Sequence, residues 1–217
     1  MAARCTLPPR FWPQARTARS CKSESDTRMP RPKLHSDDDI LDTAQLVLLR
    51  QGPSHFTLSD VAKAVGISRA ALIQRFTDKA TLQLRVMERM TQEVRDYFDA
   101  APSHTGLAPL WTMLKDLIGG MGSGEDAAGH LLLYWGDTQE PALRALALER
   151  NELVRGAIER RLPSEPHNPE QASGLVQAVI QGACMQWLIA RNGPLDAFMT
   201  EQTRQVLSVL YPGHTFE

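Results

Sequence analysis

Two short helices joined by a tight turn are the feature that most restricts how this sequence can fold. Thr57-Leu-Ser-Asp60 is a Ser/Thr-x-x-acid pattern, which starts a helix because its side-chain oxygens satisfy unpaired backbone N–H groups. Gly66 ends that helix by supplying a positive φ. Ser68 can cap another helix almost at once. Two such helices joined by a short glycine turn form a helix-turn-helix, which we expect at residues 58–65 and 68–75.

A longer helix precedes this motif. Ser36 is followed by three aspartates, which place a capping oxygen and negative charge at a helix N-terminus. Apolar residues then recur on one face until Gly52-Pro53 ends the helix. We therefore predict a three-helix domain at residues 36–82, with Thr77 capping the helix that follows.

The remaining sequence, residues 83–217, reads as helices only, because no segment alternates in the manner of a strand. Glycine and proline separate the helical stretches. The predicted fold class is all-α, with the small domain followed by a larger helical domain. The expected helices cover residues 78–101, 107–121, 126–137, 141–162, 169–192 and 195–210.

The first 35 residues differ from the rest in being rich in Arg, Pro and Ser, and we expect this basic tail to be disordered. Met29, followed by Pro-Arg-Pro-Lys, is an alternative start, so residues 1–28 could be a misassigned upstream extension. If they belong to the protein, their arginines could reach phosphates or a minor groove, as basic arms do. A transit-type peptide is the weaker alternative.

Charge is distributed unevenly along the chain, although the formal net charge is only −1. Residues 1–35 hold eight bases and two acids, and residues 50–85 hold six bases and two acids. Residues 86–217 hold ten bases and seventeen acids. A basic end on an acidic remainder is typical of a protein that meets a polyanion at one end, although a solvated basic face gives the same pattern.

Several classes of protein are not supported by the sequence. We expect no membrane-spanning segment, no secretory signal and a cytoplasmic location. The three cysteines, Cys5, Cys21 and Cys184, are too dispersed for a metal site and are expected to be reduced. GxSxG, P-loop, GxGxxG and HExxH motifs do not occur, so we expect neither an enzyme nor a bound cofactor.

Residues 56–82, FTLSDVAKAVGISRAALIQRFTDKATL, resemble the DNA-binding segment of the TetR family of bacterial transcription regulators. The resemblance is specific over residues 36–82 and loose afterwards. It implies a homodimer that binds double-stranded DNA and a C-terminal domain that senses a small molecule. One departure is Ile73, which stands where the family commonly has a tyrosine that touches a phosphate.

The helix from Ser68 is the expected DNA-reading element. Small side chains at its start allow close approach to base edges in the major groove, and Arg69 is the best candidate for reading a guanine. Lys79 is expected to contact a phosphate, the alternative being a solvated lysine balanced by Asp78. The predicted DNA contacts are Thr57, Ser68, Arg69, Ala70, Ala71, Ile73, Gln74, Arg75 and Lys79.

A strip of small residues predicts the dimer interface. Gly174, Ala178 and Gly182 recur at four-residue spacing, which lets another helix approach closely, and Val206 and Leu210 lie on the final helix. In TetR-like proteins two such helices pair across a dimer axis, which presents two recognition helices to half-sites about 34 Å apart. The alternative is that the strip packs within one subunit.

The predicted ligand is a small hydrophobic effector bound among the middle helices, an expectation that comes from the resemblance. The alternative is that most of the candidate pocket residues are ordinary core. A DNA-binding or interaction protein of the same fold without a ligand is the alternative function. The candidates are Trp111, Leu114, Tyr134, Trp135, Cys184 and Trp187.

Overall fold

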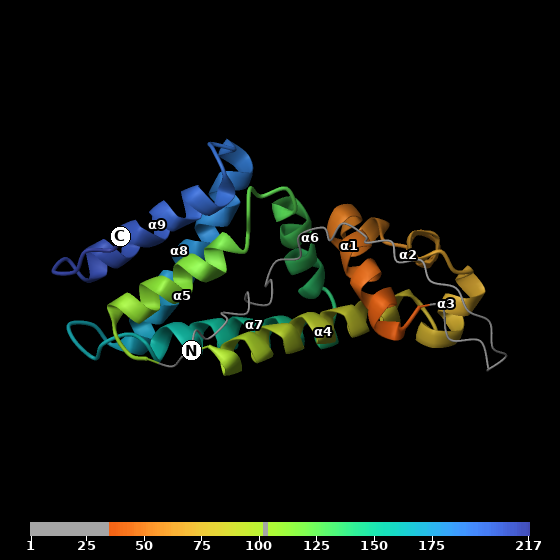
Figure 1. Cartoon of the computed structure of the whole chain (residues 1–217), viewed down its shortest axis with the longest axis horizontal. Coiled ribbons are helices and arrows are strands. Elements are labelled where there is room, and N and C mark those ends of the chain that lie inside the picture. Colours follow the sequence, from red (N-terminus) through yellow and green to blue (C-terminus); the bar gives the residue numbers. More distant parts are fainter. Residues whose placement is uncertain (1–34, 102–103) are drawn as a thin grey trace, which may run out of the picture.

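The computed structural model describes residues 35–101 and 104–217, and in these ranges all of the regular structure is helical, which confirms the predicted all-α class. The residues of the predicted N-terminal tail before His35 lie outside the described residues. Figure 1 shows α1 to α3 at one end of an elongated molecule. The helices are α1 Asp37–His55, α2 Leu58–Val65, α3 Arg69–Phe76, α4 Lys79–Ala100, α5 Leu107–Gly119, α6 Ala127–Asp137, α7 Pro141–Glu159, α8 Pro169–Ala190 and α9 Leu195–Leu210.

The helix starts follow the capping residues of the sequence. The Ser36 hydroxyl accepts a hydrogen bond from the Asp39 backbone N–H at 3.0 Å, and the Asp39 carboxylate accepts from the Ser36 backbone N–H at 2.9 Å. Thr57 and Ser68 cap α2 and α3 as predicted: the Thr57 hydroxyl accepts from the Asp60 backbone N–H, and the Ser68 hydroxyl accepts from the Ala71 backbone N–H. These side chains satisfy backbone donors that a helix leaves unpaired at its start.

The predicted cap of α4 was wrong by one residue. Asp78, not Thr77, caps this helix, and its carboxylate accepts from the Thr81 backbone N–H at 2.7 Å. Asp78 has the extended backbone that an N-cap requires, whereas Thr77 has a φ of 62°. Thr77 instead forms the turn between α3 and α4.

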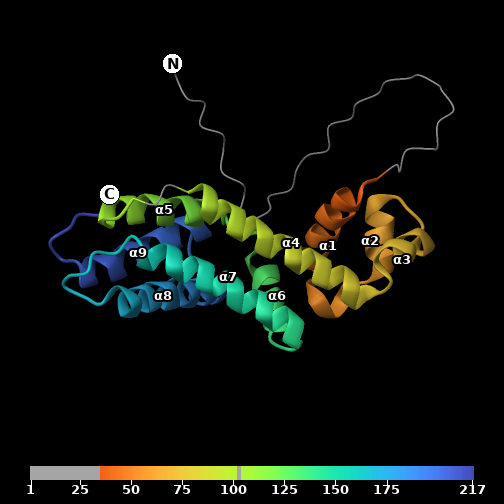
Figure 2. The same cartoon turned by 90° about the horizontal axis from the view of Figure 1, so that it is seen from below.

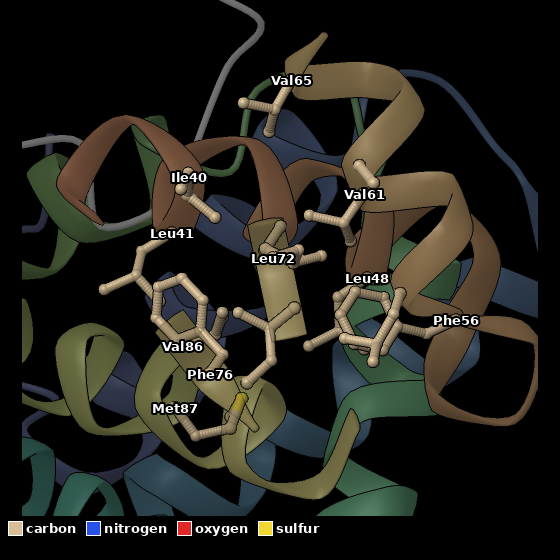
Figure 3. Packing of buried hydrophobic residues seen from close by; sticks show 14 of the residues in the cluster. Ile40, Leu41, Leu48, Phe56, Val61, Val65, Leu72, Phe76, Val86 and Met87 are labelled. Carbon is tan, nitrogen blue, oxygen red and sulfur yellow. The ribbon is translucent and has the colours of Figure 1, made fainter. Parts of the chain in front are cut away.

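The core of the three-helix end is continuous with the rest of the molecule. Leu72 of α3 and Phe56 before α2 are fully buried, together with Leu48 of α1 (Figure 3). The same cluster takes in Val86 of α4 and Leu133 of α6. Because α4 also runs unbroken through the boundary predicted at residue 82, the small domain shares both a core and a helix with the larger one.

The larger part is a helical bundle. α7 packs along α4 and against α8, while α9 packs on α8 and α5 (Figures 1 and 2). Its core is centred on residues such as Leu110, Val176 and Leu207, which are fully buried. This bundle holds α4, and with it the helix-turn-helix end, in a fixed direction.

α6 is the second connection between the two parts, because it packs directly on α1. A Cβ added at Gly129 of α6 would lie 1.9 Å from the backbone carbonyl oxygen of Leu49. One added at Gly136 would lie 2.7 Å from the ring of Pro53. Glycine at both positions therefore allows the two helices to approach more closely than any larger residue would.

α8 bears on the expectation that the chain has no membrane-spanning segment. Residues 171–190 carry no charged side chain, and among the described residues α8 is the one helix long and apolar enough to cross a membrane by length and composition. Only 28% of its most apolar window is buried within the chain. The helix nevertheless packs against α6, α7 and α9, so its uncovered side is one face of a bundle helix.

We predict that Gly129→Ala lowers the free energy of unfolding by about 1–3 kcal/mol, because the new methyl group meets backbone that cannot rotate away. Gly119→Ala is the matched control, since a Cβ there has nothing within 4 Å. Urea unfolding of both variants checks this, and the control should be unchanged or more stable by up to about 1 kcal/mol. Equal stability of the two variants would contradict the tight α1–α6 contact.

Candidate nucleic-acid interface and ligand cavity

α3 is amphipathic, and its first turn is the more exposed part. Leu72 and Phe76 face the core, while Arg69, Ala70 and Gln74 are exposed. Of the other predicted contacts, Thr57 and Ser68 are exposed, and Ala71, Ile73, Arg75 and Lys79 are partly buried. The first turn of α3 therefore projects from the molecule with small side chains and one arginine.

Four of the predicted contacts meet in one place. Thr57, Arg69, Ile73 and Lys79 line a surface recess of about 340 Å³ between α2, α3 and the start of α4. Ser59, which the sequence did not single out, lines it as well. Its position two residues after the N-cap Thr57 was the available signal, because the first turn of a helix presents hydroxyl and backbone N–H donors to an anion.

Lys79 is held by a partner that the sequence did not suggest. Its Nζ donates to the backbone carbonyl oxygen of Pro53 at 2.8 Å. Asp78 is engaged in capping, and the hydrogen bonds from Thr81 hold the pKa of its carboxyl below the ordinary value. An ammonium group has three protons. The bond to Pro53 therefore fixes the position of Lys79 beside the recess and leaves it donors for a phosphate.

The two arginines of α3 differ in their surroundings. Arg75 Nη1 donates to the backbone carbonyl of His35 at 2.8 Å and lies 3.3 Å from the Asp37 carboxylate. It thus ties the end of α3 to the start of α1. Arg69 is exposed and has no hydrogen bond or ion pair within residues 35–101 and 104–217. Of the two, Arg69 is the guanidinium that remains available for an external acceptor.

The turn after α3 stores backbone strain. Thr77 has φ 62° and ψ −64°, and the Asp78 N–H donates to the Phe76 carbonyl at 2.6 Å across it. This three-residue turn is strained for any L-residue, and more so for one branched at Cβ. Thr77 also lines the recess. The strain therefore sits beside the exposed arginine.

A second concave site lies inside the bundle. A cavity of about 350 Å³, open on one side, is lined by α4, α6, α7 and α8 together with Met121, which follows α5. Its walls are mainly apolar and include Met87 and Met90 of α4 and Met185 of α8. Methionine is flexible and polarisable, so such walls adapt to apolar ligands of different shapes. Volume and lining are those of a small-molecule site.

The structure brings only two of the six predicted pocket residues to this cavity, Tyr134 and Cys184. Trp111 and Leu114 are buried in the α5 core, where the Trp111 indole donates to the Glu217 carbonyl at 2.5 Å. The Trp187 indole donates to the Gly193 carbonyl at 3.0 Å, also inside the bundle. Trp135, in contrast to these buried residues, is 68% exposed. Aromatic content alone therefore did not locate the cavity.

The charged residues of the cavity were missed by sequence reasoning. Asp137 of α6 is 1% exposed and pairs with Arg150 of α7 at 2.5 Å. Burial raises the pKa of the Asp137 carboxyl to about 6, although the Arg150 guanidinium opposes the rise. Burial raises the pKa of Glu93 as well and lowers that of His130 to about 4. A signal was available in Asp137, the one acid in an otherwise uncharged α6.

The predicted interface strip lies along the uncovered face of α8. Ala178 is exposed, and a Cβ at Gly174 or Gly182 would have nothing within 4 Å. Val206 and Leu210 of α9 are partly buried against the subunit's own core. The exposed large apolar side chains around the strip are Leu175, Met185 and Ile189 of α8 and Val209 of α9.

Comparison with known proteins supports the prediction that α1 to α3 form a DNA-binding segment. Residues 40–86 match the family model described as bacterial regulatory proteins of the tetR family. No curated protein matches the chain. The sequence match covers α2 and α3 entirely and reaches into α4.

Solved structures share the fold across most of the chain. A tetR-family transcriptional regulator from Streptomyces coelicolor superimposes with a TM-score of 0.64 at 18% identity, covering 81% of each chain. A regulator structure from Saccharomonospora viridis in complex with choline has a TM-score of 0.64 at 18% identity, covering 78% of this chain and 93% of that one. The multidrug binding protein EbrR complexed with proflavin has a TM-score of 0.53 at 21% identity, covering 77% and 96%.

An exposed helix-turn-helix followed by a larger helical bundle is the arrangement of DNA-binding transcription regulators such as the Streptomyces coelicolor protein. Residues 40–86 are therefore similar to the DNA-binding segment of the tetR family of bacterial regulatory proteins. The chain as a whole shares the fold of solved tetR-family regulators.

We predict that Thr77→Gly raises the free energy of unfolding by about 1 kcal/mol, since relief of about 1–3 kcal/mol of strain exceeds the entropic cost of glycine. Thr77→Ala is the control at the same position, because alanine also resists a positive φ and should give no gain. Urea unfolding measures both. A Gly variant no more stable than the Ala variant would show that the turn is unstrained.

Proposed function

We propose that this chain is a repressor that binds a pseudo-palindromic operator as a homodimer and is released by a small apolar or aromatic effector. The observation that carries the proposal is the first turn of α3, where Arg69 projects beside a recess that also holds Lys79. A regulator of this kind acts on DNA in the cytoplasm.

The contacts at the recess divide into two roles. Arg69 is exposed and at the start of the helix, which suits bidentate reading of a guanine in the major groove. Thr57 and Ser59 begin α2, where hydroxyl and N–H groups suit a phosphate. Lys79 is fixed by the Pro53 carbonyl and suits a phosphate too. The arrangement supports one base-reading side chain held in register by backbone contacts.

Pairing of two subunits is supported by the apolar surface on α8. Ile189 is 88% exposed and Val209 of α9 is 79% exposed. Contact of such large apolar side chains with water is unfavourable, so a patch of them indicates an interaction surface. The strip of Gly174, Ala178 and Gly182 on α8 lets a second α8 pack at short distance. A two-fold pair of this kind presents two α3 helices to half-sites related by the same symmetry.

Release by an effector is supported by the position of α6. This helix lines the cavity through Leu133 and Asp137, and it also rests on α1 through Gly129. A molecule that fits the cavity better when α6 has shifted would favour the arrangement in which α1 to α3 are displaced from their DNA-binding positions. Structures of the same fold bound to proflavin and choline add support for a small-molecule site.

The DNA-binding roles are tested by selecting bound sequences from random duplexes with the wild type and two variants. Arg69→Ala should relax the preference at one base position per half-site, with a loss of about 1–3 kcal/mol on the selected operator. Lys79→Ala should weaken all sequences alike and flatten the salt dependence by about one phosphate contact.

Since Lys79 also bonds to Pro53, the unfolding free energy of its variant is measured beside DNA binding. Loss of base preference to the same degree in both variants would contradict the separate roles. A protein that binds no duplex DNA even at low salt would overturn the proposal as a whole.

Dimerisation through α8 is tested by placing a charge on the strip. Ala178→Glu should weaken the dimer at least about 100-fold and with it operator binding, because the carboxylate would be desolvated between two apolar helices. Ala145→Glu, exposed on α7, is the matched control and should remain dimeric. Sedimentation equilibrium measures both variants, and an Ala178→Glu dimer as tight as the wild type would place the interface elsewhere.

Effector binding is tested by thermal unfolding across a library of small hydrophobic compounds, since a ligand of the folded state raises its stability by mass action. Compounds that stabilise the protein should also reduce operator binding. No shift with any compound favours a regulator of the same fold without a ligand.

A further inference from the structure

The cavity between α4, α6, α7 and α8 contains more negative than positive charge. Glu93 and Asp137 line it as acids, and Arg150 is the one Lys or Arg that does so among the described residues. Burial lowers the pKa of His130 to about 4, so its imidazole is neutral near pH 7. With both carboxylates ionised the lining carries one net negative charge.

Arg150 is already committed to the protein. Its Nη2 donates to Asp137 Oδ2 at 2.5 Å, and its Nη1 donates to the Thr91 hydroxyl at 2.8 Å. Thr91 is itself buried and donates to the Met87 carbonyl. This chain holds the guanidinium against α4 and α6. Arg150 therefore orients Asp137 rather than offering a free cation to a ligand.

Asp137 has one oxygen that no protein group satisfies. Its Oδ1 is buried and has no hydrogen-bond partner within residues 35–101 and 104–217, although the residue is only 1% exposed. A buried carboxylate oxygen without a donor costs free energy, and such an atom in a ligand cavity marks the place of a ligand donor or cation. Glu93 adds a second carboxylate, which Arg89 approaches only to 3.5 Å while also contacting Asp38 and Asp42.

The rest of the lining suits the apolar body of such a ligand. Four methionines contribute polarisable sulfur, and Tyr134 at the rim presents an aromatic ring that is 47% exposed. Aromatic faces and thioethers both attract organic cations. An anion would instead meet two carboxylates in an apolar enclosure, at a high desolvation cost.

We propose that the effector of this cavity is an organic cation, a protonated amine or a delocalised aromatic cation with an apolar body, whose charge lies against Asp137 Oδ1. Glu93 contributes long-range attraction from α4, and the methionines enclose the body. This inference rests on the proposed function for the role of the ligand, but binding itself does not depend on DNA.

The test compares three probes of similar size by isothermal titration at about pH 7.5, where the Asp137 carboxyl is ionised and an alkylamine is charged. The probes are N,N-dimethylbenzylamine as the cation, isobutylbenzene as its uncharged carbon isostere, and phenylacetate as the anion. The cation should bind at least about ten-fold more tightly than the isostere, since charge-assisted hydrogen bonds are stronger than neutral contacts. Phenylacetate should bind most weakly.

Two cavity variants and one control test whether the preference for the cation depends on the carboxylates of the cavity. Asp137→Asn keeps an acceptor for Arg150 but removes the charge, and it should bring the cation-to-isostere ratio to within about three-fold. Glu93→Gln should reduce the cation-to-isostere ratio by a smaller factor. Because Glu93 is partly exposed, this variant should still fold and can be measured if Asp137→Asn folds poorly. Asp99→Asn changes the net charge equally at an exposed position of α4 outside the cavity lining, and it should leave the ratio unchanged.

Four outcomes would overturn the inference: equal or tighter binding of the isostere, tightest binding of phenylacetate, an unchanged ratio in both cavity variants, and binding of none of the probes. Operator binding of the wild type, measured separately, distinguishes these failures from failure of the proposed function. Operator binding without cation binding rejects only the cation site. Cation binding that leaves operator affinity unchanged rejects only release by the effector.

Discussion

The structure depends on the close packing of α6 against α1, because this contact joins the helix-turn-helix end to the cavity. Gly129 lies directly on the Leu49 carbonyl, and Gly136 lies on the ring of Pro53. Close-packed backbone resists gradual deformation and favours a small number of discrete arrangements. The position of α6 therefore fixes α1, and α1 fixes the helices that pack on it.

Pro53 extends this constraint toward the recess. Its ring faces α6 at Gly136, while its carbonyl oxygen accepts the hydrogen bond from Lys79. Gly52, with a φ of 74°, turns the chain so that both contacts are made by one residue. A single bend at the end of α1 thus contacts a helix of the cavity through the Pro53 ring and the recess residue Lys79 through the Pro53 carbonyl.

Local features of this fold were predictable from sequence because their causes are local. Ser36, Thr57, Ser68 and Gly66 cap or end helices through atoms a few residues away, so the starts of α1 to α3 and the ends of α2 and α3 could be placed within about a residue. The predicted end of α1 at Gly52-Pro53 was wrong, because the helix resumes after the non-helical Gly52 and runs to His55. The prediction of Thr77 as the N-cap of α4 was wrong because both Thr77 and Asp78 are residues that can cap a helix. The backbone conformation of the turn makes Asp78 the cap.

Features that depend on packing between distant helices were not predictable in the same way. Trp111 and Trp187 are as apolar as any cavity residue, and only tertiary packing directs them into the core. Asp137 and Arg150 meet across two helices, and Arg75 meets Asp37 across the small domain, at separations that no sequence pattern encodes. The available cue was an acid in an uncharged helix, which indicates a buried partner without naming it.

The open apolar face of α8 has a quantitative consequence for how a homodimeric regulator responds to its own abundance. Below the dissociation constant of the pair, dimers form in proportion to the square of the subunit concentration. Occupancy of a two-fold binding site would then rise more steeply with expression level than it would for a monomer. If two subunits pair through this face of α8, its apolar contact area sets the dissociation constant of the dimer, and with it how steeply the occupancy changes with gene dosage.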